Sequence, residues 1–300
     1  GPRGACAVTP QDDGWDDDWD DEEEWEQEEW DEDDWEADAE GPAGDAGFAV
    51  PSKVMRSVTL GFLACLPLWI AYEVALTHAG EGWRGTAEIL ALRALEPFGE
   101  HVTWIRRLLM GALTIAAAVT FARRHRGALP KLLRVVGEGA LAAALLGPIL
   151  VALLHLSGVG ADALPPAPST VPPGSMGLLV LGAGAWEELV FRALVYGAVY
   201  VLTLHLVRFL GTPTRLDRTI SEVVALIGQA GLFAAAHVAS FVEPFGAYGE
   251  PFDAAAFPYR VLAGILLGLL FRWRGLGVAA WAHGLFNLAL LLGAGPQVFS

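Results

Sequence analysis

The sequence predicts an all-α membrane protein, a polytopic bundle of about seven helices preceded by an acidic tail. Hydrophobic residues make up 54% of the 300 residues, more than ordinary soluble domains contain. They gather in runs of about 20 residues, the length that crosses a bilayer as a helix. The acidity is confined to one segment: residues 11–40 hold 20 of the 35 Asp and Glu residues and no Lys or Arg.

Residues 1–50 are predicted to be a disordered tail, and residues 51–300 to be the transmembrane domain. The tail is acidic and of low complexity, and its tryptophans are four to six residues apart, which fits neither a helical stripe nor strand alternation. We interpret it as a solvated, self-repelling segment. The alternative is an interaction tail for a basic cytoplasmic partner, with the indoles as anchors. These tryptophans are Trp15, Trp19, Trp25, Trp30 and Trp35.

Seven apolar segments are predicted to span the bilayer, and six to eight are allowed. The fourth segment is longer than a bilayer requires, so we expect it to tilt, protrude or break, with Gly182 and Gly184 as the weak point. Residues 78–101 are predicted to form a loop with a short interfacial helix. The spans are residues 54–76, 102–122, 135–156, 175–210, 219–241, 258–271 and 276–292.

Basic residues alternate between the predicted loops. The segments 123–134, 208–218 and 272–274 are basic, whereas the connectors 157–174 and 242–257 contain no Lys or Arg. The positive-inside rule therefore places the N-terminus in the cytoplasm, although Arg106 and Arg107 argue against this orientation. The composition suits a multi-pass protein of a bacterial inner membrane, and no nucleic-acid partner is expected.

Two adjacent carboxylates and a guanidinium lie inside the fourth apolar run. Charged groups in lipid are costly, so they normally face a protein interior or a wet cavity and mark function. Glu188 and Arg192 are four residues apart and can pair on one helix face. Glu187 points about 100° away and lacks this partner, which suits a general base. The alternative is a Glu–Arg pair that only holds two helices together, but this alternative gives no role to Glu187.

Two later spans carry the other polar side chains. Phe233 and His237 belong to Phe-Ala-Ala-Ala-His, and His237 could orient a water together with Glu187. His283 and Asn287 are four residues apart, share a helix face, and can donate hydrogen bonds to an oxyanion. The alternatives are a histidine that only hydrogen-bonds across the bundle and an asparagine that only joins helices.

In this order, and each in a separate apolar span, the three patterns resemble the CPBP family. Glu187, Glu188 and Arg192 match Glu-Glu-x-x-x-Arg, Phe233 and His237 match Phe-x-x-x-His, and His283 and Asn287 match His-x-x-x-Asn. This family comprises the CAAX and bacteriocin-processing intramembrane proteases, also called Abi proteins. The resemblance covers residues 175–292. It implies an all-helical membrane fold and peptide-bond hydrolysis in a cavity within the bilayer.

The resemblance also implies roles for these residues. Glu187 would activate water, His237 would hold the same water, and His283 and Asn287 would form the oxyanion hole, with Glu188, Arg192 and Phe233 in support. No cofactor is expected. Zinc on Glu187, His237 and His283 is the alternative, but a zinc site also needs an open position and tight outer-shell orientation.

The function predicted is an intramembrane endopeptidase that cuts a membrane-associated peptide or protein. The first alternative is a scaffold or immunity protein that keeps the fold without proteolysis. A transporter with a polar midplane site ranks last, because no inverted repeat is evident between the two halves of the chain. The substrate and the metal dependence stay open.

Overall fold

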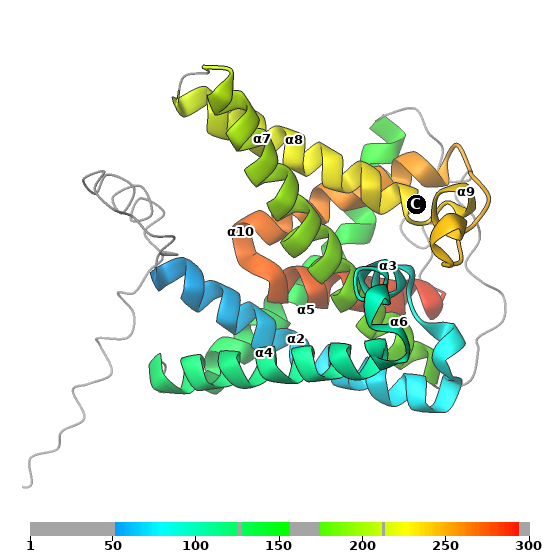
Figure 1. Cartoon of the computed structure of the whole chain (residues 1–300). Coiled ribbons are helices and arrows are strands. Elements are labelled where there is room, and N and C mark those ends of the chain that lie inside the picture. Colours follow the sequence, from blue (N-terminus) through cyan, green and yellow to red (C-terminus); the bar gives the residue numbers. More distant parts are fainter. Residues whose placement is uncertain (1–51, 125–127, 157–174, 212–213, 294–300) are drawn as a thin grey trace, which may run out of the picture. The chain divides into compact units, whose positions relative to one another are not determined.

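The computed structural model describes residues 52–124, 128–156, 175–211 and 214–293 (Figure 1). The predicted tail and the connector 157–174 lie outside these residues. The described part is helical apart from one isolated bridge between Val238 and Glu250, which confirms the predicted fold class. Its elements are α2 (Ser52–Ala79), η2 (Glu81–Trp83), α3 (Thr86–Arg93), η3 (Glu96–His101), α4 (Val102–Arg124), α5 (Ala128–Leu156), α6 (Ser175–Glu187), η5 (Glu188–Tyr196), α7 (Gly197–Phe209), α8 (Thr214–Ala235), α9 (Ala239–Val242), η6 (Glu243–Phe245) and α10 (Ala256–Leu291).

Five long helical stretches in the described residues have the length and apolarity to cross a membrane. These are residues 58–79, 96–123, 129–156, 175–209 and 256–291. The count is below the predicted seven for two reasons. The sixth and seventh predicted spans form one element, α10, and α8 is not among the five. The short helix predicted before the second span is α3.

The helix α10 is divided by a break at Gly275. This residue has φ 82° and ψ 179° within an otherwise helical run, a conformation open to glycine because it has no Cβ. The break follows Arg274, where the sequence predicts a turn between two spans. Figure 1 shows α10 changing direction at its middle, so its two limbs can contact different helices.

α10 is the central element of the bundle and packs against α2, α5, α6 and α8. Glycines permit its closest approaches, as small residues do in membrane helix pairs. A Cβ added to Gly277 would lie 3.1 Å from the Cα of Gly61 on α2. One added to Gly184 on α6 would lie 2.7 Å from the backbone nitrogen of Gly284. The helices therefore meet backbone to backbone at both crossings.

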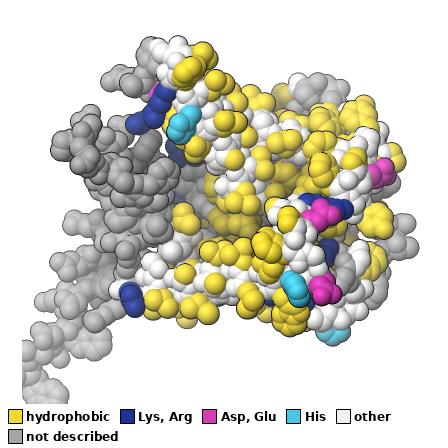
Figure 2. Space-filling view, viewed as in Figure 1, with side chains coloured by type: hydrophobic (Ala, Val, Ile, Leu, Met, Phe, Trp, Pro, Cys, Tyr) yellow, Lys and Arg dark blue, Asp and Glu magenta, His cyan; other side chains and the backbone are white. Residues whose placement is uncertain are grey.

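The outer surface of the bundle is apolar. Figure 2 shows hydrophobic side chains over most of the face in view. On α4, Leu108 and Ile115 are 70% and 66% exposed, a level that a soluble protein rarely allows for large apolar residues along one helix. Lipid chains rather than water are the solvent that suits this surface. The protein is therefore a multi-pass membrane protein.

Candidate active site

The two glutamates lie where the fourth span changes its helical form. Of the three outcomes expected for this long span, which were tilt, protrusion or a break at Gly182 and Gly184, the break does not occur: the helix is continuous from Ser175 to Phe209, and its irregularity is a π-helical stretch, η5, that begins at Glu188. Both glycines are packed against neighbouring helices instead, where a Cβ would overlap backbone atoms. π-helical turns are uncommon and often mark functional sites.

Glu188 and Arg192 form the buried ion pair that their spacing predicts. Arg192 Nη1 lies 3.2 Å from Glu188 Oε1, and both side chains are fully buried. Glu187 differs, because its side chain keeps 15% of its surface exposed. The pair is thus sealed inside the bundle, whereas Glu187 faces a space that a small molecule such as water can reach.

His283 lies between the two carboxylates. Its Nδ1 is 2.7 Å from Glu188 Oε1, and its Nε2 is 3.4 Å from Glu187 Oε2. A carboxylate only accepts hydrogen bonds, so Nδ1–H is the donor to Glu188. This bond fixes the ring orientation and directs Nε2 towards Glu187. The approach of His283 to Glu187 depends on the crossing of α6 and α10 at Gly184 and Gly284. Gly184 lies three residues before Glu187, and Gly284 directly follows His283.

His237 lies beyond the helix that was predicted to carry it. The fifth predicted span runs to residue 241, which is wrong, because α8 ends at Ala235 and His237 occupies the turn before α9. Its Nδ1 is 2.9 Å from the carbonyl oxygen of Phe233. A carbonyl can only accept, so Nδ1 carries the proton, and Nε2 of the neutral ring keeps a free lone pair. His237 is partly exposed, which leaves that lone pair available to a water.

The aromatic ring of Phe233 connects the separate parts of the site. Its centroid is 5.0 Å from that of His237, 5.7 Å from that of His283 and 5.5 Å from that of Phe191. The Arg192 guanidinium lies 4.5 Å from the same centroid, within the range of a cation–π interaction. Phe233 is therefore the common contact of both histidines and the buried arginine.

Asn287 is on the same limb of α10 as His283, four residues later. Its side chain is partly buried and forms no hydrogen bond to any residue that the structure describes. A partly buried amide without a partner has two N–H donors available to a ligand.

The structure does not gather the three residues considered for zinc into a ligand set. Among the described residues, no group of three or more His, Cys, Asp or Glu side chains is arranged to hold a metal ion. Glu187 and His283 are neighbours, and the ring of Phe233 contacts both His283 and His237.

The structure contains a second buried charge cluster that the sequence patterns do not predict. Glu88 of α3 is fully buried, accepts a hydrogen bond from the Tyr72 hydroxyl at 2.7 Å, and pairs with Arg84 and Arg106. Arg106 Nη1 also lies 2.6 Å from Glu73 Oε1. The two arginines that argue against the predicted orientation therefore have a structural role, since Arg107 pairs with Glu73 as well. Only folding brings residues 73, 88 and 106 together.

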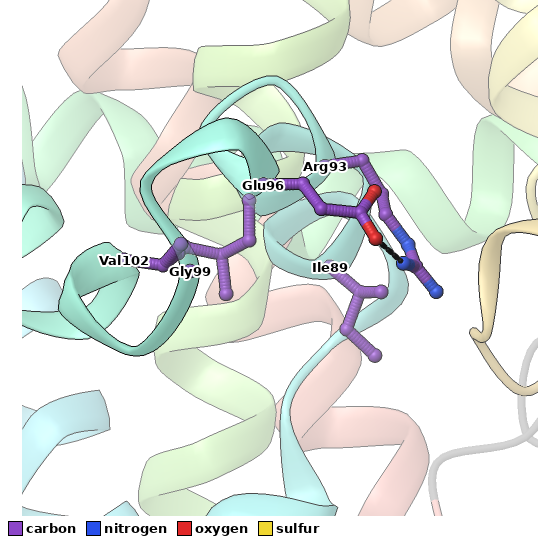
Figure 3. Close-up of a pocket in the computed structure, with 6 residues that line it drawn as sticks. Ile89, Arg93, Glu96, Gly99 and Val102 are labelled. Atoms are coloured by element: carbon purple, nitrogen blue, oxygen red, sulfur yellow. Dashed lines mark hydrogen bonds and ion pairs between the residues drawn. The ribbon is translucent and has the colours of Figure 1, made fainter.

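This second cluster places α3 beside the site. Ala87 of α3 packs with Val190, Phe191, Phe233 and Ala236 in one apolar cluster. Arg106 lies 5.6 Å from the ring centroid of Trp186, the residue before Glu187. An open pocket of about 280 Å³ lies between α3, η3 and the start of α4 (Figure 3). None of its lining residues belongs to the site: they are Ile89, Leu92, Arg93, Glu96, Gly99 and Val102.

Comparison with known proteins is consistent with the predicted family. Residues 169–289 match the family model described as type II CAAX prenyl endopeptidase Rce1-like. No curated protein and no solved structure matches the chain. The matched segment contains all three motifs and all the residues that form the site described above. Residues 169–289 are therefore similar to the Rce1-like, CAAX-type (CPBP) family of intramembrane endopeptidases.

Proposed function

We propose that this protein hydrolyses a peptide bond of a membrane-associated peptide or protein, with Glu187 as the base that activates water. The observation that carries the proposal is the contrast between the two adjacent carboxylates. Glu188 is fully buried and paired with Arg192 and His283, whereas Glu187 is partly exposed, and its Oε2 has no hydrogen-bond partner among the described residues. A carboxylate oxygen that accepts no hydrogen bond within the protein can accept a proton from a bound water.

The chemical step that we propose needs only side chains of this site. Water lies between Glu187 and the lone pair on Nε2 of His237. Glu187 takes one proton from this water while the water oxygen attacks the carbonyl carbon of the scissile bond. The carbonyl oxygen becomes an oxyanion. When the carbon–nitrogen bond breaks, Glu187 returns the proton to the leaving amine, which balances the reaction.

His283 and Asn287 are proposed to stabilise the oxyanion. In this proposal His283 donates Nδ1–H to Glu188 and donates from Nε2, on the side where Glu187 lies, to the oxyanion. The Asn287 amide, without a partner among the described residues, supplies a second donor. Donors fixed before the reaction stabilise developing charge in a site from which bulk water is excluded. Glu188 and Arg192 act through His283 by fixing its ring.

The proposal requires no metal, and zinc on Glu187, His237 and His283 is the alternative. The substrate class is also open: the matching family is described as a CAAX prenyl endopeptidase, whereas a bacterial chain could process an unmodified peptide or another membrane protein. We further propose a cytoplasmic N-terminus in a bacterial inner membrane and a basic cytoplasmic partner for the tail. Digestion of the tail in inverted vesicles, but not in intact cells, tests the orientation.

The test uses the full chain in nanodiscs with two quenched fluorogenic peptide sets, one prenylated at a C-terminal CAAX cysteine and one unmodified. We expect wild type to cleave one set and Glu187→Gln to lose about 10²- to 10⁴-fold in rate, the usual contribution of a general base. Glu100→Gln, an exposed carboxylate outside the site, is the matched control. Each sample is measured with and without a chelator.

Three outcomes separate the alternatives. Cleavage that survives chelation and depends on Glu187 supports the proposal. Cleavage that a chelator abolishes and zinc restores selects the metalloenzyme. If Glu187→Gln and His283→Ala both support the cellular role without cleavage, the protein is a scaffold.

A further inference from the structure

His237 is fixed by a segment that follows it in the chain rather than by its own helix. Its carbonyl oxygen accepts a hydrogen bond from the backbone nitrogen of Glu250 at 2.8 Å. The carbonyl oxygen of Glu250 in turn accepts one from the backbone nitrogen of Ala239 at 2.7 Å. These two bonds enclose Val238 and form the isolated bridge of the structure. The backbone of Glu250 therefore holds the turn that carries His237.

The contact between these two segments is close enough to require a glycine. A Cβ on Gly249 would lie 2.5 Å from the backbone nitrogen of Ala239 and 2.7 Å from the carbonyl carbon of Val238. Real Cβ atoms do not approach backbone atoms so closely. Any displacement of Glu250 is thus transmitted directly to the turn at residues 237–239.

Arg260 holds the side chain of Glu250. Its Nη2 lies 2.5 Å from Glu250 Oε2, and the Arg260 side chain is only 17% exposed, whereas that of Glu250 is 63% exposed. Arg260 is on the first limb of α10, whose start is held by Asp253, which accepts hydrogen bonds from the backbone nitrogens of Ala256 and Ala255. These bonds lower the pKa of the Asp253 carboxyl group. The cation is therefore anchored to a rigid helix and the carboxylate to a loop.

The other end of the loop is tied to α3. Arg93 Nε donates to the carbonyl oxygen of Phe245 at 2.5 Å, and the Thr86 hydroxyl donates to that of Tyr248 at 3.1 Å. These bonds hold residues 245–248 but not Glu250, which bonds directly to His237. The position of His237 relative to α10 thus depends on the ion pair between Glu250 and Arg260.

We propose that Glu250 and Arg260 are positioning residues for His237. Their ion pair is a clamp that sets the distance of His237 from Glu187 and from the limb of α10 that carries His283. The inference rests on the proposed function, since it assigns His237 to the water. An ion pair with one exposed partner contributes little to global stability. A displacement of about 1 Å in a reacting group can lower a rate by about 10²-fold. The clamp should therefore affect turnover far more than folding.

The test is a charge swap in the full chain in nanodiscs. Arg260→Glu and Glu250→Arg each place like charges together, and the double variant restores an opposite pair. We expect each single variant to lower kcat by about 10- to 100-fold with KM within about twofold, and the double variant to recover most of kcat. Arg272→Glu, which disrupts a comparable ion pair away from His237, should leave kcat unchanged.

Hydrogen exchange of the amides at residues 236–242 supplies a readout independent of cleavage. We expect faster exchange in both single variants and recovery in the double variant. Unchanged exchange in the single variants would overturn the clamp, and faster exchange with unchanged kcat would overturn its role in positioning. If wild type cleaves no peptide, the proposed function fails, and exchange still decides whether the clamp exists.

Discussion

Two buried charge clusters in this protein each contain a fully buried glutamate paired with arginine, but the two carboxylates differ in their partners. In the α2–α3–α4 cluster both oxygens of Glu88 have partners, Oε2 with the Tyr72 hydroxyl and Oε1 with two arginines. In the site only Oε1 of Glu188 has partners, and Oε2 has no hydrogen bond within the described residues. The three guanidinium nitrogens of Arg192 likewise have no hydrogen bond within the described residues.

The difference separates a structural role from a functional one. A buried polar group without a partner is costly, so native proteins retain few, and these need an explanation. The α2–α3–α4 cluster joins helices, because Arg106 of α4 pairs with Glu73 of α2 and Glu88 of α3. Its atoms without a hydrogen bond within the described residues include Nε and Nη2 of Arg106, which can only donate. In the site, Oε2 of Glu187 and Oε2 of Glu188 have no hydrogen bond within the described residues and can accept one from a ligand. We therefore propose that the site on α6, η5 and α10 is the cluster that does chemistry.

The largest expected effect is that of neutralising each buried glutamate. Glu88→Gln leaves Arg84 and Arg106 without a full counter-charge, and breaking a buried ion pair costs about 3–5 kcal/mol. We expect a lower thermal midpoint in detergent but normal activity per folded molecule. Glu188→Gln should lower both the thermal midpoint and the activity, because the charged acceptor of His283 Nδ1–H becomes a neutral amide. Glu96→Gln, an exposed pair with Arg93, should change stability by less than about 1 kcal/mol.

An equal loss of activity per folded molecule in Glu88→Gln and Glu188→Gln would break the comparison. It would mean that the α3 cluster contributes to the chemistry. Circular dichroism before and after heating gives the folded fraction by which each activity is divided.

The second effect concerns one donor of the oxyanion hole. Asn287→Ala removes an amide that has no structural partner among the described residues, so the thermal midpoint should hold. Loss of one such donor typically lowers kcat by about 10²- to 10³-fold. Single-turnover kinetics with saturating enzyme measure the chemical step. A variant with normal kcat would remove Asn287 from the site.

A smaller effect follows from the helix crossing beneath the site. Gly184→Ala places a Cβ 2.7–2.8 Å from backbone atoms of Gly284, and overpacking of this kind costs about 1–3 kcal/mol. It should also lower activity, because α6 carries Glu187 and α10 carries His283. Gly197→Ala is the matched control, because no atom lies within 4 Å of its added Cβ. Equal thermal midpoints for the two variants would contradict the close crossing.

The smallest effect is expected outside both clusters. Deleting residues 1–45 removes the whole acidic segment 11–40, which we predict from its composition to take no part in a packed core. Membrane insertion and peptide hydrolysis should remain at the level of the full chain, as measured by membrane fractionation and the fluorogenic assay. Loss of the fold on deletion would show that the tail is an integral part of the domain.

The sequence by itself determined the fold class and the identity of the polar residues in the site. Apolar runs of bilayer length can satisfy their backbone groups only as helices, so most helix positions follow from composition. The Glu188–Arg192 pair follows from spacing alone, because residues four apart share a helix face. The motif order predicts that His237, His283 and Asn287 belong to the same site.

Only the tertiary structure decided how these residues meet. The end of α8 at Ala235, the π-helical stretch after Glu187 and the bridge to Glu250 depend on contacts between segments far apart in the chain. Arg106 and Arg260 carry no local signal, because each finds its partner on another element. Glu88 has one near partner, Arg84, but its pairing with Arg106 of α4 depends on the fold. A sequence pattern reports the period of one helix, whereas the pairing of charges across helices is set by how closely their backbones approach.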